Sequence, residues 1–108
     1  MDRRLFLAQR FSAMVLAPLV LTHLGVIIYA IQGVLSAAEI LGRTQGSLGW
    51  GLFYGAFVLA ASVHAPIGLR NILAEWTPLP RRAADALAIA AGLALLALGL
   101  RAVWIVTA

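Results

Sequence analysis

The sequence contains no cysteine and no lysine, and few of its residues are charged. Without cysteine, this chain cannot form disulfides, zinc–thiolate sites or iron–sulfur ligation of its own. Only 11% of its residues are charged, whereas a soluble domain has about a quarter. Hydrophobic residues make up 63%, and the mean hydropathy is +0.98. A soluble fold with so little polar surface would aggregate, so the composition predicts an integral membrane protein.

The usual signatures of a catalytic chain are also missing. The sequence has no dinucleotide-binding fingerprint, no nucleophile paired with a base and no pair of carboxylates. We therefore expect no catalytic residue, and we do not expect this chain to oxidise a substrate by itself.

Three apolar runs, at residues 11–33, 48–69 and 86–106, dominate the sequence. Each is close to the roughly 20 residues that a helix needs to cross about 30 Å of hydrocarbon, and the first is too long for the core of a signal peptide. Three segments cannot close a membrane barrel, which excludes strands. We predict an all-α, three-helix transmembrane protein with residues 1–108 as one domain.

The connections and small residues add detail to this prediction. Residues 37–41 are expected to form a short interfacial helix, and the Thr77–Pro80 segment should end the second helix because proline lacks an amide donor. Gly51 and Gly55 have the Gly-x-x-x-Gly spacing of close helix packing. The third run, rich in Ala and Leu, is expected to be a plain lipid-facing or bundle-filling helix.

The arginines predict the orientation in the membrane. They cluster before the first run and around the second connection: Arg3, Arg4, Arg10, Arg70, Arg81 and Arg82. Positive residues favour the cytoplasmic side, so the N-terminus and residues 79–85 should face the cytoplasm and the C-terminus should face out. Because the arginines are confined to short segments between apolar runs, we expect no nucleic-acid partner.

The two histidines, His23 and His64, lie inside the first and second runs. An ionisable ring at membrane depth is costly, which suggests a function, although a neutral histidine can also simply bridge two helices. Around His64, the small residues Ala60, Ala61 and Gly68 would leave space for a planar ligand such as a porphyrin, or would serve helix packing. Both interpretations stay open on this pattern alone.

The stretch from His64 to Trp76 resembles the second helix of a known family. His64, Gly68, Arg70, Glu75 and Trp76 match a His-x-x-x-Gly-x-Arg pattern followed by an acidic and an aromatic residue. This pattern is similar to that of the cytochrome b membrane anchors of succinate dehydrogenase and fumarate reductase.

The first run carries a further likeness to that family. Arg10-Phe11-Ser12 resembles the opening of the family's first helix, and His23-Leu24 with Tyr29 resembles the first helix of its two-haem branch. Three positions depart from the family: Glu75-Trp76 replaces the usual Asp-Tyr, Gln9 stands where histidine is common, and Asn71 stands where some members have histidine.

The resemblance implies a haem b anchor in the bacterial inner membrane that passes electrons between an iron–sulfur subunit and quinone. It implies His64 and His23 as iron ligands, with Arg70 and Gly68 near the cofactor. The implied quinone contacts are Arg10, Ser12, Glu75 and Trp76. The implied partners are iron–sulfur and flavoprotein subunits, a second anchor chain, membrane lipid and quinone. A haem-free structural anchor is the alternative, and a transporter half with a histidine proton relay is the least favoured because the spans hold no acidic partner.

Residue counting predicts that the two histidines lie at different depths. His23 is 13 residues beyond Arg10, about 20 Å along a helix, whereas His64 is 6 residues before Arg70, about 9 Å. One chain should therefore not supply both ligands of one iron. The second ligand would come from another copy, which gives a two-haem homodimer, or from a small paralogous subunit, which gives one haem. We favour the homodimer.

Overall fold

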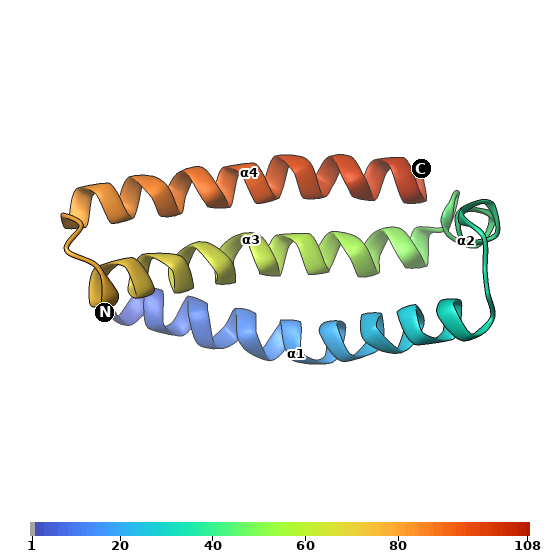
Figure 1. Ribbon diagram of the computed structural model, residues 1–108, viewed down its shortest axis with the longest axis horizontal. Coiled ribbons are helices and arrows are strands. Elements are labelled where there is room, and N and C mark those ends of the chain that lie inside the picture. The colour runs from blue at the N-terminus through green and yellow to red at the C-terminus, as the bar shows by residue number, and fades with distance from the viewer. Residues whose placement is uncertain (1) are drawn as a thin grey trace.

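The computed structural model describes residues 2–108 as four helices with no strand among them. In chain order they are α1 (Arg3–Gln32), α2 (Ala37–Thr44), α3 (Leu48–Trp76) and α4 (Arg81–Thr107). Three of them, α1, α3 and α4, are long and apolar enough to cross a membrane (Figure 1). The predicted all-α architecture with three spanning helices is confirmed.

The three long helices extend beyond the apolar runs, chiefly at one end. α1 begins at Arg3 because the Asp2 side chain accepts a hydrogen bond from the amide of Arg4. α3 continues to Trp76, where the Thr77-Pro78 pair stops it, and α4 begins directly after Pro80. At about 1.5 Å per residue, the 30 residues of α1 span about 45 Å, more than the hydrocarbon layer.

The extra helical turns meet at one end of the molecule, where α1 begins, α3 ends and α4 begins (Figure 1). We call this the arginine-rich end, because it carries Arg3, Arg4, Arg10, Arg70, Arg81 and Arg82. The two termini lie at opposite ends, as an odd number of spans requires.

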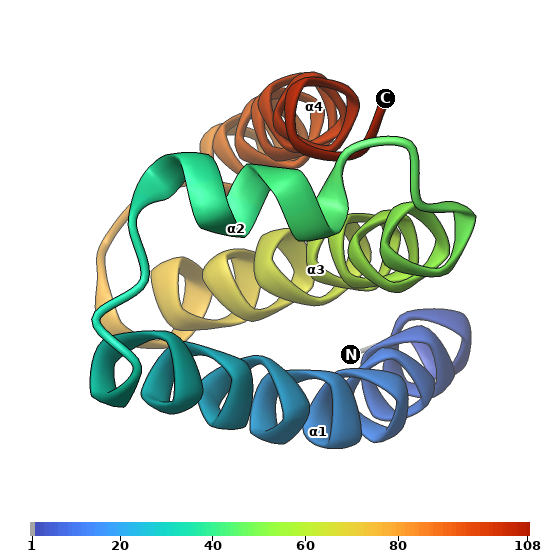
Figure 2. The same cartoon turned by 90° about the vertical axis from the view of Figure 1, so that its right-hand side faces the viewer.

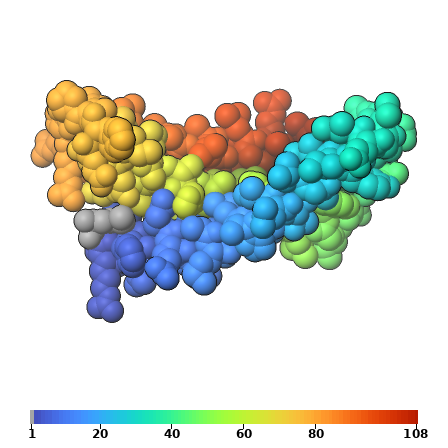
Figure 3. Space-filling view, turned by 60° about the horizontal axis from the view of Figure 1, so that its bottom comes forward, coloured from blue at the N-terminus to red at the C-terminus, as the bar shows by residue number. Residues whose placement is uncertain are grey.

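α3 is the central helix, with α1 on one side and α4 on the other (Figures 1 and 2). Part of its surface stays visible between α1 and α4 (Figure 3). Few side chains are buried within this single layer; they are Ser12, Thr44, Ile67, Ala84 and Ala88. Many large apolar side chains are therefore exposed, as expected of a chain solvated by lipid.

Glycines of α4 make the tightest contacts with α3. A Cβ atom added at Gly92 would lie 2.8 Å from Cγ of Pro66, and one added at Gly99 would lie 2.6 Å from Cγ1 of Val58. Missing side chains let helix backbones approach closely in membranes. Two glycines of the third span thus allow its close approach to α3.

The two glycines of α3 that were predicted to pack closely, Gly51 and Gly55, differ in their contacts. A Cβ atom at Gly51 would lie 3.5 Å from the Thr107 hydroxyl, so this position does approach α4, whereas nothing lies within 4 Å of one at Gly55. Among residues 2–108, Gly51 therefore packs closely against a neighbouring helix and Gly55 does not.

The short helix α2 crosses the end of the molecule opposite the arginine-rich end (Figure 2). It starts with a capping box, in which Ser36 and Glu39 each accept a bond from the other's backbone amide. The Thr44 hydroxyl donates to the Val106 carbonyl at 2.7 Å, and the Gly46 amide donates to Thr107 at 2.9 Å. The interfacial helix expected at residues 37–41 thus forms, continues to Thr44 and is fastened to the end of α4.

Candidate functional site

His64 of α3 contacts α1 through Ser12. The Nδ1 atom of His64 lies 3.3 Å from the Ser12 hydroxyl oxygen, and the same hydroxyl donates to the Gln9 carbonyl at 3.0 Å. Ser12 is only 4% exposed and is the one buried residue of α1. A serine that bonds back to its own helix is common, but here it also reaches a histidine 52 residues away in sequence.

Gly68, one helical turn after His64, faces the Gln9 side chain of α1. A Cβ atom added at Gly68 would lie 3.4 Å from the Gln9 amide nitrogen. The Gln9 Oε1 atom is buried and has no hydrogen-bond partner among residues 2–108. The Gln9 side chain of α1 thus lies directly against the position of Gly68.

His23 has a different, aromatic environment. Its ring meets the rings of Tyr54 and Phe57 edge-on, each with centroids 5.6 Å apart. Trp50 and Phe53 extend this cluster along α3. Within the described part of the chain, no hydrogen bond or ion pair reaches the His23 ring.

The two histidines lie at different levels, in agreement with the residue count. His64 is level with Ser12 of α1, whereas His23 is level with Tyr54 and Phe57 of α3. Ser12 and His23 are 11 residues apart on α1, which is about 16 Å along a helix. One chain therefore cannot place both imidazoles on one iron.

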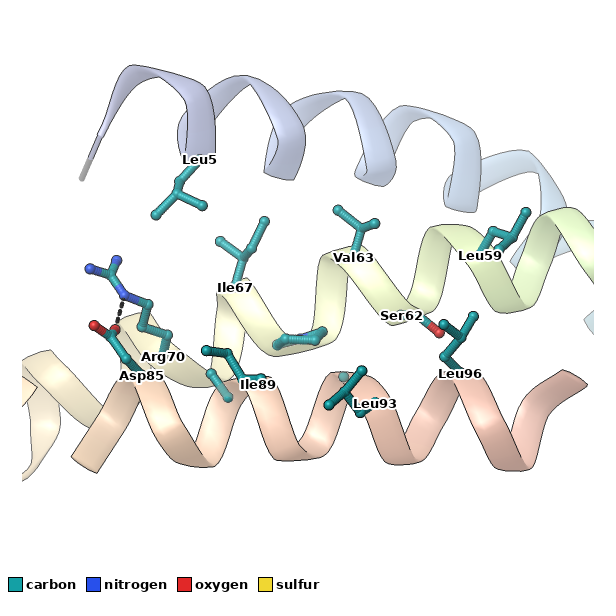
Figure 4. A pocket seen from close by; sticks show the side chains of 13 residues that line it. Leu5, Leu59, Ser62, Val63, Ile67, Arg70, Asp85, Ile89, Leu93 and Leu96 are labelled. Carbon is teal, nitrogen blue, oxygen red and sulfur yellow. Dashed lines mark hydrogen bonds and ion pairs between the residues drawn. The ribbon is translucent and has the colours of Figure 1, made fainter. Parts of the chain in front are cut away.

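Arg70 pairs with Asp85 of α4. Its Nε atom donates to Asp85 Oδ1 at 2.5 Å, with side chains 17% and 43% exposed. The pair lies at one end of a groove of about 600 Å³ lined mainly by apolar side chains of α3 and α4, with Leu5 of α1 (Figure 4). Arg70, expected near the cofactor, is thus engaged by an acid that sequence reasoning missed. The available signal was an acid directly before the third apolar run.

The four residues expected to contact quinone do not share one pocket. Glu75 lines a space of about 260 Å³ together with Arg70 and Arg81, but neither Arg10 nor Ser12 lines it. Trp76 is 82% exposed, and Arg10 is also exposed. In this single chain, Ser12 belongs to the His64 contact and Glu75 to the arginine-rich end.

A second polar contact lies near α2. Arg43 donates from Nη1 to the Tyr29 hydroxyl at 3.2 Å, and its guanidinium carbon lies 5.5 Å from the centre of that ring. The hydrogen bond to Tyr29 raises the pKa of Arg43 above its usual value, so the guanidinium stays charged. A pocket of about 320 Å³ between α1, α2 and α3 opens beside it.

No group of three or more His, Asp or Glu side chains in residues 2–108 is close enough to hold a metal ion. A metal centre built by this chain alone from several side chains is therefore not present in that range. The candidate ligands are single imidazoles, each of which needs a further ligand from a macrocycle or a second chain.

The fold and site define a membrane protein of three spanning helices, with one histidine held between two of them near the arginine-rich end. The family model described as the succinate dehydrogenase/fumarate reductase transmembrane subunit matches residues 2–105. The chain belongs to this family, which confirms the family that the sequence resembles. No curated protein and no solved structure gives a significant match.

Proposed function

We propose that the chain is the haem b-binding membrane anchor of a succinate dehydrogenase or fumarate reductase complex, passing electrons between an iron–sulfur subunit and membrane quinone. One observation carries this proposal: the His64 imidazole is held from α1 by Ser12, inside a membrane subunit of this family. The chain itself would be a non-catalytic subunit for substrate oxidation.

The residues around His64 suit haem. The imidazole is half-buried, and one of its ring nitrogens contacts Ser12, so the other would be available to bind the haem iron. Gly68 leaves space one turn away, because nothing but the Gln9 amide nitrogen lies within 4 Å of an added Cβ atom. Bound haem b would supply one-electron redox chemistry.

The protein would tune that chemistry by its surroundings. The apolar spans keep water away from the imidazole, which lowers the local dielectric, and the hydrogen bond at Nδ1 orients the ring. Arg70 adds positive charge two residues beyond Gly68, partly balanced by Asp85. These residues would bind the cofactor, orient its ligand and adjust its potential.

The arginine-rich end would receive the soluble partners. Its helices extend beyond the apolar runs, so folded turns project from the hydrocarbon where iron–sulfur and flavoprotein subunits would dock. By the positive-inside rule this end faces the cytoplasm, which suits a bacterial inner membrane. Arg10, Glu75 and Trp76 remain the proposed quinone contacts at this end.

A second anchor chain would supply the other histidine that holds the iron. The chain has two histidines at different levels, so each iron needs an imidazole from another copy or from a paralogous subunit. His23 has no polar partner in the described chain, which leaves its nitrogens available for a second haem in a homodimer.

The alternative is a haem-free structural anchor, and the same contact favours it, because a Ser12–His64 hydrogen bond also satisfies a neutral histidine between two helices. A reduced-minus-oxidised absorption spectrum of the purified complex separates the two. The proposal expects a b-type band. A complex that contains this chain and all its subunits but shows no such band would establish the structural anchor instead.

A further inference from the structure

Ser12 lies where it can determine which nitrogen of His64 carries the ring proton. We propose that Ser12 is a positioning residue that holds neutral His64 with its hydrogen on Nδ1 and leaves Nε2 as the lone-pair donor. The consequence for haem rests on the proposed function, whereas the choice of tautomer does not.

The argument begins with the single hydrogen of the Ser12 hydroxyl. The hydroxyl oxygen lies 3.0 Å from the Gln9 carbonyl of α1, and because a carbonyl oxygen can only accept, this contact requires the hydroxyl hydrogen to point toward it. The Ser12 Oγ atom then faces His64 Nδ1, 3.3 Å away, with a lone pair. Two lone pairs at this distance would repel each other, so the contact is favourable only when Nδ1 carries the hydrogen.

A hydrogen on Nδ1 determines the state of the other ring nitrogen, Nε2. Neutral imidazole has one N–H, so a hydrogen on Nδ1 leaves Nε2 unprotonated, which is the form that ligates iron. Burial strengthens this selection, because Ser12 is only 4% exposed and water cannot easily replace it as the partner of Nδ1.

This assignment gives Ser12 a role different from quinone binding. Its hydrogen is committed to Gln9 and its lone pair to His64, so it has no donor to offer a quinone carbonyl. A hydrogen bond from the non-ligating nitrogen increases the basicity of an axial histidine. A more basic ligand stabilises the oxidised iron, so Ser12 should lower the haem midpoint potential.

The two histidines provide an internal comparison. His23 makes T-shaped contacts with two aromatic rings and has no hydrogen-bond partner within residues 2–108, so no hydrogen bond from that range fixes its tautomer. The prediction therefore applies to one ring of the two.

The first experiment needs no haem. The full chain, labelled with ¹⁵N-histidine and placed in lipid nanodiscs, gives nitrogen chemical shifts that distinguish the two tautomers, and His64→Ala identifies which signals belong to His64. We expect protonated Nδ1 in the wild type and a shift toward protonated Nε2 in Ser12→Ala. Ser12→Thr, which keeps a hydroxyl, should restore the wild-type pattern.

Ser62→Ala is the matched control. Ser62 lies two residues before His64 on α3, and its buried hydroxyl has no partner in the described chain, so its loss should leave the His64 signals unchanged. A wild-type His64 protonated at Nε2, or a tautomer that is the same in Ser12→Ala, would overturn the proposal.

The second experiment uses the assembled complex. Ser12→Ala should keep the b-type band but raise its midpoint potential, and Ser62→Ala should leave the potential unchanged. A wild-type complex without haem would contradict the proposed function and leave the tautomer result standing. Haem with an unchanged potential in Ser12→Ala would instead contradict the role of Ser12 alone.

Discussion

The guanidinium of Arg70 and the carboxylate of Asp85 join α3 to α4 at the arginine-rich end, with Nε 2.5 Å from Oδ1. The two residues are 15 apart in sequence and lie on either side of the Thr77–Pro80 connection. Charge-assisted bonds of this kind are stronger than neutral ones, especially when partly shielded from water. The pair therefore holds the C-terminal part of α3 against the start of α4. It also restricts the position of the Arg70 side chain beside the groove.

Removing the charge of Asp85 should weaken this end of the molecule. We expect Asp85→Asn to destabilise the helical bundle by about 1 kcal/mol, because Asp85 is partly exposed and solvent screens the pair. Helix content followed by circular dichroism during titration with a denaturing detergent measures this loss. Glu75→Gln is the control: it removes an acid from the same end that makes no ion pair within residues 2–108. Equal stability of the two variants would show that the Arg70–Asp85 bond contributes nothing measurable.

The glycine contacts between α3 and α4 make a second prediction. Gly92→Ala and Gly99→Ala should each cost about 1 to 3 kcal/mol, since the new methyl group would overlap the Pro66 ring or the branched Val58 side chain. Alanine favours helix over glycine by about 1 kcal/mol, so Gly25→Ala, with nothing within 4 Å, should be neutral or stabilising. The same detergent titration compares all three. Stabilisation by Gly92→Ala would mean that α4 does not approach α3 this closely.

The orientation in the membrane can be measured directly, because the chain has no native cysteine. Gln45→Cys, exposed at the end of α2, should react with a membrane-impermeant maleimide in intact spheroplasts, and Arg81→Cys should react only after permeabilisation. Thr44 is unsuitable for labelling because it is buried against α4 and bonded to Val106. The reverse labelling pattern would invert the topology.

Local sequence patterns predict the helices well. The apolar runs identify three spans because lipid exposure requires long uninterrupted hydrophobic segments, and the Thr77-Pro78 pair ends α3 through the geometry of proline. His64 and Gly68 were recognisable because the family pattern lies within one helix. The helix ends were harder to predict, because the charged turns at Arg3 and Glu75 remain helical outside the hydrocarbon.

Contacts between helices could not be predicted from the sequence. The meeting of Ser12 with His64 depends on the register of α1 against α3, which no local pattern determines. The same applies to Arg70 with Asp85 and to Gly92 with Pro66, where the rotation of α4 decides which small or charged residue faces α3. The Gly51-Gly55 spacing was visible, yet only Gly51 approaches α4.

Haem content per chain in His64→Ala is the most direct test of the central claim. Complexes purified by a tag on a soluble subunit can be quantified for haem by pyridine haemochrome and for this chain by immunoblotting. We predict that His64→Ala, inserted and assembled at the normal level, loses at least half of the haem, and that His23→Ala keeps the haem bound at His64. An assembled His64→Ala complex with its full haem content and an unchanged spectrum would contradict the assignment of His64 as the ligand.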